Sequence, residues 1–178
     1  MQCRQREKRI AFMTEFQRII LVHYHEIGLK GRNRSTFEMR LLKNLEKMLG
    51  GYPVVTIHRI AGRLLVFLTE GTDYDTAMSC ADAIVGVPGV ARVSCGYKCE
   101  RDMTVMGEAA KLALSEAHEF TSFKVSARRN HTDFDIDSMT INREIGAVLC
   151  EAFPDKRVMM KTPDVTVGVE VVQNATYV

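Results

Sequence analysis

Hydrophobic and polar residues follow two different periods along the first hundred positions. Short runs rich in β-branched residues predict four strands, at 18–25, 54–60, 63–69 and 90–99. Apolar stripes predict two helices, one after the capping-box pattern S-T-F-E at 35–38 and one opening at Thr72. The second helix is expected to turn these residues inward: Met78, Ala81, Ile84 and Val85. The order strand, helix, strand, strand, helix, strand is the split βαβ, or ferredoxin-like, arrangement.

The remainder of the chain predicts a second mixed unit. A helix is expected near Thr104 and another after Asp137 or Ser138, either of which suits a helix N-cap. Strands are expected at 122–129, 157–161 and 165–172, with a polar loop at 130–137. The chain is therefore predicted to be an α/β (α+β) protein with three parts: a disordered tail, an N-terminal ferredoxin-like βαββαβ domain and a second α/β domain, at 1–15, 16–100 and 101–178.

Composition is that of an ordinary globular protein, with 46% hydrophobic and 26% charged residues. No apolar run is long enough to cross a bilayer, and the apolar stretch at 10–13 is too short for a secretory signal. Met13 is a possible translation start, because ordered patterning begins only at Phe16. The cysteine count is five, an odd number with no disulfide spacing, so we expect reduced thiols in the cytoplasm.

Charge is distributed unevenly. Residues 1–70 hold 13 Lys and Arg against 6 Asp and Glu, whereas residues 71–178 hold 11 against 16. A basic half favours a polyanionic partner, although a merely solvated basic surface would give the same count.

The first candidate binding site is the loop Lys30-Gly31-Arg32-Asn33-Arg34. Three cations beside a glycine, just ahead of a predicted helix, suit a phosphate group. The spacing is not that of a P-loop, so contact with a nucleic-acid backbone is favoured over nucleotide catalysis. The alternative is a solvated loop.

The second candidate lies at the end of the strand 122–129. Arg, Asn and Lys side chains there suit phosphates, sugars and unpaired base edges. The proposed members are Arg128, Arg129, Asn130, Asn142, Arg143 and Lys161. The alternative is that the arginines pair with nearby acids, namely Asp133, Asp135 and Asp137.

No catalytic or metal site is predicted. His23 and His25 share one strand face beside Glu26, but no further ligands can be named. Cys95 and Cys99 have no matching second pair. No nucleophile–base pair or nucleotide loop is present, so no cofactor is expected in this chain.

Several separated motifs resemble those of tRNA 4-thiouridine synthetases, also called tRNA sulfurtransferases, in the same order. E-I-G-L-K-G-R-N-R at 26–34 and V-P-G-V at 87–90 resemble the start of that enzyme. Three phrases resemble its THUMP domain: F-K-V-S-A-R-R-N, D-S-M-T-I-N-R-E-I-G and K-T-P-D-V-T-V-G-V-E-V. His25 departs from the pattern, which has a small residue at that position.

The resemblance implies a ferredoxin-like domain followed by a THUMP domain that binds the acceptor end of tRNA, including the single-stranded CCA terminus. The parent enzyme activates a uridine with ATP and Mg²⁺, transfers sulfur to it and feeds sulfur into thiamine synthesis. That chemistry belongs to a following pyrophosphatase domain, whose S-G-G-x-D-S loop is absent here. We therefore expect a non-catalytic chain, either an excised fragment or a truncated gene product.

Position by position, the resemblance assigns the first loop to the acceptor-stem backbone, through Lys30, Arg32 and Arg34. It assigns to the RNA end Arg128, Arg129, Asn130, Asn142, Arg143 and Lys161. The expected partners are tRNA and the catalytic domain, a homodimer is a further candidate, and no membrane partner is expected. Rival interpretations are a small-molecule regulatory module, a dimerisation domain, and a metal-dependent nucleic-acid enzyme using His23, His25 and Glu26.

Overall fold

The chain folds into two compact units, residues 17–96 and residues 97–178, with Phe16 joining the second. The computed structural model describes residues 16–25, 32–60, 62–130 and 133–178, with the backbone alone at 32 and 33. The predicted tail and the start of the first basic loop, including Lys30, lie outside the described residues.

The first unit has the predicted order of elements. They are β1 (Gln17–Tyr24), α2 (Arg32–Met48), β2 (Val54–Ile60), β3 (Arg63–Leu68), α3 (Tyr74–Val85) and β4 (Val90–Cys99). The sheet order is β2-β3-β1-β4, and β3 pairs antiparallel with both β1 and β2. The ferredoxin-like prediction is therefore confirmed.

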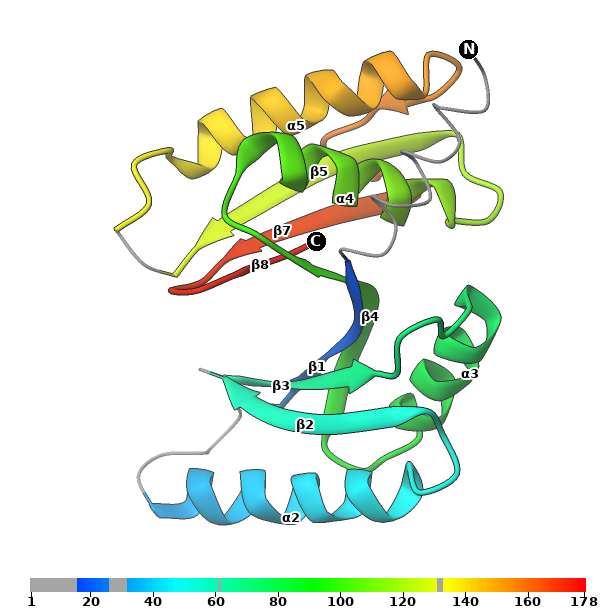
Figure 1. Ribbon diagram of the computed structural model, residues 1–178, viewed down its shortest axis with the longest axis vertical. Coiled ribbons are helices and arrows are strands. Elements are labelled where there is room, and N and C mark those ends of the chain that lie inside the picture. The colour runs from blue at the N-terminus through cyan, green and yellow to red at the C-terminus, as the bar shows by residue number, and fades with distance from the viewer. Residues whose placement is uncertain (1–15, 26–31, 61, 131–132) are drawn as a thin grey trace. The chain divides into compact units, whose positions relative to one another are not determined.

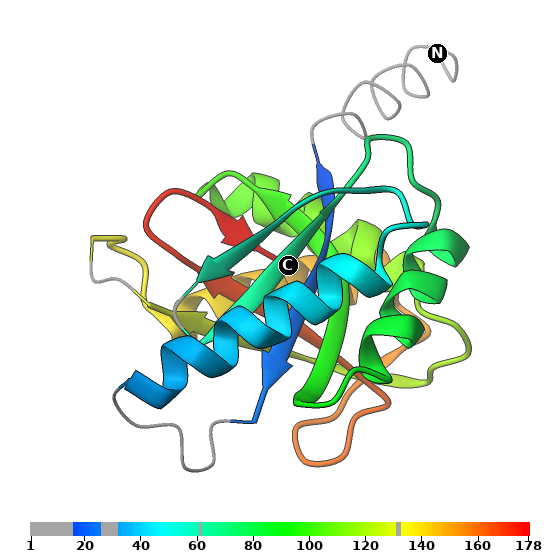
Figure 2. The same cartoon turned by 90° about the horizontal axis from the view of Figure 1, so that it is seen from below.

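Helices α2 and α3 cover one face of this sheet (Figure 2). In β1, alternate residues point toward the helices because side chains on a strand alternate between its two faces. Leu45 of α2 and Ile84 of α3 are completely buried in this core, and burial of each such side chain contributes about 1.5–3 kcal/mol. The sheet residues of the core include Ile20, Val22, Tyr24, Leu64 and Val66.

One end of the unit depends on a close approach between Gly89 and α2. Gly89 has a φ of 101°, and a Cβ built on it would lie 2.8 Å from the ring of Phe37. Only glycine combines that backbone conformation with that contact. The backbone N–H of His25 also donates to the Gly89 carbonyl, at 3.1 Å. The end of β1, the first turns of α2 and the start of β4 are thus held together.

Two local expectations in this unit are wrong. Helix α2 begins at Arg32, before the predicted capping box, so Arg34 lies in a helix and not in a loop. The Glu38 side chain contacts Tyr24, Arg34 and Arg59, so it is not a helix-capping group. Val85 was expected to be buried but is 58% exposed, because α3 buries Ala77, Cys80, Ala81 and Ile84.

The second unit is a mixed sheet with two helices. Its remaining elements are α4 (Met103–Ser115), β5 (Ser122–Arg129), α5 (Ser138–Ala152), β6 (Arg157–Val158), β7 (Val165–Val171) and β8 (Thr176–Tyr177). The strand order is β4-β8-β7-β5-β6; β5 runs parallel to β6 and β7, and β8 runs antiparallel to β7 and to the last residues of β4. β6 is shorter than predicted, and β8 was not predicted.

Helices α4 and α5 cover one face of this second sheet (Figure 1). The alternation predicted for β5 is confirmed, since Phe123, Val125 and Ala127 pack toward the helices. Each helix begins at an aspartate cap: Asp102 accepts from the N–H groups of residues 104 and 105, and Asp137 accepts from that of residue 140. The shared core contains Met106, Ala110, Leu114, Ile141, Ile145, Leu149, Val167 and Val169.

Asp164 fastens the connection between β6 and β7 to the start of β5. One carboxylate oxygen accepts four hydrogen bonds of 2.9–3.0 Å, from the backbone N–H and the hydroxyl of both Thr121 and Ser122. These donors lower the pKa of Asp164 to about 2, because each favours the ionised form.

Candidate nucleic-acid interface

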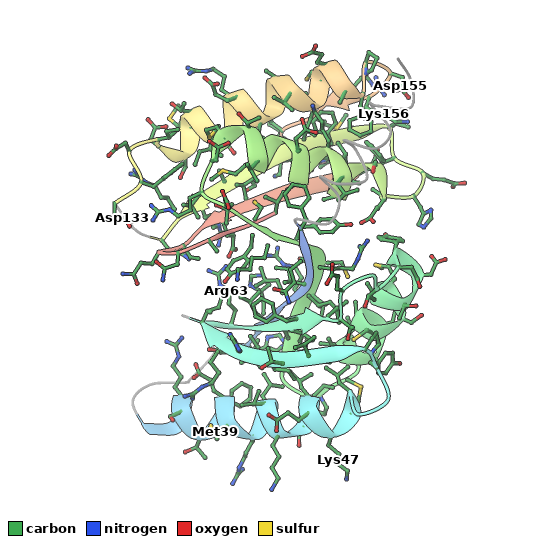
Figure 3. All side chains as sticks on the ribbon, viewed as in Figure 1. Met39, Lys47, Arg63, Asp133, Asp155 and Lys156 are labelled. Carbon is green, nitrogen blue, oxygen red and sulfur yellow. The ribbon has the colours of Figure 1, made fainter. Side chains whose placement is uncertain are left out.

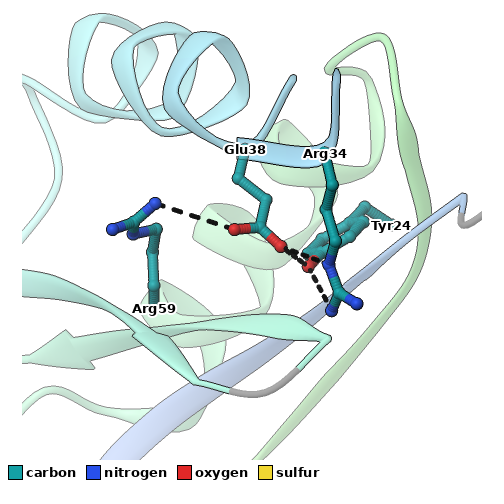
Figure 4. Close-up of polar contacts among 4 residues, drawn as sticks. All are labelled: Tyr24, Arg34, Glu38 and Arg59. Carbon is teal, nitrogen blue, oxygen red and sulfur yellow. Dashed lines mark hydrogen bonds and ion pairs between the residues drawn. The ribbon is translucent and has the colours of Figure 1, made fainter. Parts of the chain in front are cut away.

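A polar cluster lies between the helix side of the first sheet and the beginning of α2 (Figure 4). Tyr24, at the end of β1, donates its hydroxyl hydrogen to Glu38 of α2. Arg34, one turn earlier in α2, donates from Nε to the same Glu38 oxygen at 2.9 Å, and its Nη2 lies 3.5 Å from the tyrosine oxygen. Arg59 reaches the other Glu38 oxygen from β2, with Nη1 at 3.7 Å. We call these four residues the Glu38 cluster.

Electrostatics fix the charges within the Glu38 cluster. Partial burial alone would raise the pKa of Glu38, but hydrogen bonds from Tyr24 and Arg34, with the charges of both arginines, outweigh it and hold that pKa below its ordinary value. Burial, followed by the neighbouring carboxylate, raises the pKa of Tyr24, so this phenol stays neutral near pH 7. The cluster thus holds two positive charges and one negative charge.

His23, at the end of β1, lies beside another arginine. Nη2 of Arg92 lies 3.4 Å from Nε2 of His23, a contact between the start of β4 and the end of β1. Within the described ranges, no group of three or more His, Cys, Asp or Glu side chains is arranged to hold a metal ion.

The predicted arginines at the end of β5 turn to opposite faces of their sheet. Arg129 points to the helix side, where Nη1 donates to the Phe134 carbonyl at 2.6 Å. Its charge also helps to lower the pKa of Asp137, after the larger effect of the hydrogen bond from the Thr140 N–H. Arg128 is exposed and alternates to the other face.

Two predicted residues of α5 have different surroundings. Asn142 has a structural contact, because its Oδ1 accepts a 2.7 Å hydrogen bond from the backbone N–H of Ala127 in β5. Arg143 lies on the outer surface with 73% of its side chain exposed, and among the described residues it pairs only with the neighbouring Glu144, at 3.1 Å. Such an exposed pair contributes roughly 0–1 kcal/mol and does not prevent Arg143 from binding another anion.

Acids compete for the positive groups at this end of the sheet. Arg101 was not predicted, yet its Nη1 lies 2.9 Å from Asp133 and also donates to the Gln173 carbonyl, while its guanidinium lies 5.2 Å from the ring centroid of Phe134. Asp137 already accepts from the first turn of α5. A protein carboxylate therefore already occupies one of the N–H groups at the beginning of α5.

Lys161 lies away from the other predicted residues of its group. It belongs to the connection between β6 and β7, where the Met159 N–H donates to the Phe123 carbonyl at the start of β5. Arg128 and Arg129 lie at the opposite end of β5, about 16–20 Å from Phe123 by strand rise. Figure 3 shows those two ends, marked by Asp133 at one and Asp155 at the other. The expectation that Lys161 reaches the same edge is not supported by this placement.

Comparison with known proteins accounts for both units. Residues 19–94 match the family model described as the ThiI ferredoxin-like domain, and residues 100–178 match that of the THUMP domain. The chain carries a ThiI ferredoxin-like domain followed by a THUMP domain. The family resemblance and the fold expected from the sequence are thereby confirmed.

Relatives and solved structures agree with these two domains. The chain is 32% identical over 160 residues to a probable tRNA sulfurtransferase of Streptococcus sanguinis strain SK36, covering 89% of this chain and 39% of that protein. It matches the crystal structure of a 4-thiouridine synthetase–RNA complex with bound ATP, with a TM-score of 0.76 and 28% identity, covering 90% of this chain and 40% of that one. It also matches the crystal structure of PH1313 from Pyrococcus horikoshii Ot3, with a TM-score of 0.74 and 27% identity, covering 90% of this chain and 52% of that one. The chain thus spans about two fifths of the sulfurtransferase relative.

The two domains divide the predicted residues into distinct groups. In the ferredoxin-like domain, Arg34 belongs to the Glu38 cluster, while Lys30 and the Arg32 side chain lie outside the described residues. In the THUMP domain, Arg129 lies on the helix side of the end of β5, where Asn142 links α5 to β5. Arg128 turns to the opposite face of the sheet, and Arg143 lies on the exposed surface of α5, so the structure does not bring these predicted residues into one contact group.

Arg59 and Arg101 take part in these contacts but were not predicted from the sequence. Arg59 had a detectable signal, because it shares a strand face with the apolar Ile57, where a charge is unexpected. Arg101 had no such signal, since its partners are Asp133 and Gln173, far away in the sequence.

No helix among the residues that the structure describes has the length and hydropathy needed to cross a membrane.

Proposed function

We propose that this chain is the tRNA-binding part of a 4-thiouridine synthetase. The THUMP domain holds the single-stranded acceptor end, and the ferredoxin-like domain contacts the stem backbone. Together they set the distance from the bound acceptor end to one uridine. The catalytic domain of the parent enzyme thiolates that uridine in an ATP-dependent reaction. The observation that carries this proposal is the exposure of two guanidiniums in a THUMP domain, Arg128 at the end of β5 and Arg143 on the outer surface of α5.

The chemistry of these side chains suits RNA. A duplex RNA major groove is too narrow and deep for side-chain readout, so proteins recognise RNA by shape, backbone contacts and unpaired bases. Arginine binds phosphate through two parallel N–H groups, which lysine cannot do. A solved relative, the 4-thiouridine synthetase, was crystallised with RNA and ATP, which supports an RNA partner and ATP use by the parent.

The test compares intact tRNA with the same tRNA lacking its CCA end, by fluorescence anisotropy with the 178-residue chain. We expect roughly tenfold weaker binding of the trimmed form, because base contacts add about 1–3 kcal/mol to phosphate contacts. Equal affinity for both forms would contradict end recognition. If about four phosphates are contacted, the logarithm of affinity should fall with the logarithm of salt concentration with a slope of about −3.

A further inference from the structure

We propose that Arg59 and Arg34 bind a phosphate of the RNA backbone together, and that Glu38 with Tyr24 holds the two guanidiniums in place. This inference rests on the proposed function and extends its stem contact to a residue of β2 that the sequence did not suggest. Arg34 and Arg59 are the binding residues in this proposal, and Glu38 and Tyr24 are positioning residues.

The ion pair between Arg59 and Glu38 is long and exposed. Its Nη1 lies 3.7 Å from Glu38, longer than a good hydrogen bond, and the side chain is 44% exposed. Such a pair stabilises a fold little. Tyr24 and Arg34 both donate to Oε1 of Glu38, whereas Arg59 approaches Oε2 at this longer distance and makes the weakest of the three contacts. The charge of Arg59 is therefore available to an anion from solution.

The Glu38 cluster is preorganised by the fold. The four members come from three elements, the end of β1, the beginning of α2 and the end of β2. Their shared carboxylate is only 16% exposed, whereas the arginines around it are 42% and 44% exposed. A fixed acceptor beneath exposed donors reduces the rotamer freedom that each arginine would lose on binding.

The Glu38 cluster has an excess of positive charge. Two guanidiniums face one carboxylate, so the cluster keeps one net positive charge. Arg34 uses Nε and Nη2 in the cluster and Arg59 uses Nη1, which leaves further N–H donors on both. A phosphodiester accepts from two such donors at once.

The experiment measures binding of a short blunt-ended RNA hairpin, which has no CCA end, to the whole 178-residue chain. Arg59→Gln should weaken binding about fivefold and flatten the salt slope by about 0.7–0.9. Arg40→Gln is the matched control, because Arg40 is an exposed arginine of the same helix α2 outside the cluster. It should change the affinity less than 1.5-fold. Arg59→Lys keeps the charge and should weaken binding while leaving the slope unchanged.

A double-mutant cycle tests the positioning residue. In a Glu38→Gln background, Arg59→Gln should weaken binding by less than 1.5-fold, because an unheld guanidinium contributes little. An undiminished fivefold effect there would show that Glu38 does not position Arg59 and would overturn that part of the proposal. Circular dichroism and thermal melting confirm that each variant folds.

The outcomes separate this inference from the proposed function. If Arg59→Gln behaves like Arg40→Gln, or if the hairpin does not bind, the Glu38 cluster is only structural and the inference is wrong. Discrimination between intact and trimmed tRNA would still support end recognition by the THUMP domain. Conversely, if the chain binds intact and trimmed tRNA equally while Arg59→Gln still weakens hairpin binding, end recognition is wrong and the phosphate contact of Arg59 stands.

Discussion

The ferredoxin-like and THUMP domains use arginines differently. In the Glu38 cluster, two arginines surround one partly buried carboxylate, so positive charge remains. At the end of β5, Arg129 and Arg101 bind backbone carbonyls, and aspartates lie nearby at Asp133 and Asp137. The first arrangement presents fixed charge. In the second, two of the four arginines fasten loops through backbone carbonyls, and the other two, Arg128 and Arg143, remain exposed.

This difference matters because composition alone does not distinguish the two arrangements. The beginning of α2 and the end of β5 are both rich in basic residues, but only the contacts in the structure show which guanidiniums remain available to bind an anion. An arginine that donates hydrogen bonds to backbone carbonyls stabilises a loop. An arginine that shares one carboxylate with a second arginine keeps N–H donors exposed to solvent. The following variants test that distinction.

The largest effect is expected from Gly89→Ala. The substitution forces alanine into a φ of 101° and places its Cβ 2.8 Å from Phe37, next to the Glu38 cluster. We expect a loss of about 2–4 kcal/mol in the free energy of unfolding of the ferredoxin-like domain, measured by urea denaturation. Gly146→Ala in α5 is the control, because its Cβ would meet nothing within 4 Å. Equal stability of both variants would show that the close approach is not required.

Neutralising the exposed pair of the THUMP domain should come next. Arg128→Gln combined with Arg143→Gln should weaken tRNA binding about 10- to 30-fold, since each contact is worth roughly 1 kcal/mol. Glutamine is preferable to glutamate, because Arg128 lies opposite Glu170 in the sheet register and a second carboxylate there would disturb the fold. Arg157→Gln with Lys161→Gln removes the same charge at the other end of β5. A comparable loss from that control would mean that binding depends on overall charge.

Acid sensitivity should identify Asp164 as a structural carboxylate. Its pKa of about 2 in the folded chain lies below the ordinary value of 3.8, so the ionised form stabilises the fold. That contribution is complete above about pH 4 and is lost as the pH falls toward 2. The stability difference between the native chain and Asp164→Asn, followed by thermal melting, should therefore shrink across this window. A constant difference from pH 6 to pH 2 would argue against the four hydrogen bonds as its source.

The smallest effect is expected from Asp137→Asn. Asparagine caps a helix as well as aspartate does, so stability should stay the same. The variant removes one carboxylate beside Arg129, and tRNA binding should tighten about two- to threefold by the usual magnitude of a charge at a helix terminus. Unchanged or weaker binding would indicate that the RNA end does not approach this helix.

Sequence predicted the elements whose side chains alternate or repeat regularly. The predicted strand at 122–129 coincides with β5, because its burial follows the strand period. The predicted strand at 54–60 coincides with β2 through its β-branched residues, although a register shift between Val54 and Thr56 interrupts its alternation. β8 was missed because two residues carry no period, and β6 was overestimated because only Arg157 and Val158 pair with β5. Local patterns cannot reveal such short pairings.

The candidate sites were predictable as regions and not as sets of contacts. The basic character of Arg34 and Arg128 was visible in the sequence, but the joining of Arg34 to Arg59 depends on the register of β2 against β3. The separation of Lys161 from Arg128 likewise follows from the parallel register of β5, β6 and β7. Both are nonlocal properties that a single sequence does not encode in any short motif.

Strand β4 has a practical consequence for anyone who wishes to study the THUMP domain in isolation. The N–H and carbonyl of Tyr97 both bond to Val178, and Lys98 and Cys99 pair with Tyr177 and Thr176. A fragment starting at residue 101 would expose β8 as a bare edge, prone to aggregation. Fragment design should therefore keep all of β4, even though its first residues belong to the neighbouring domain.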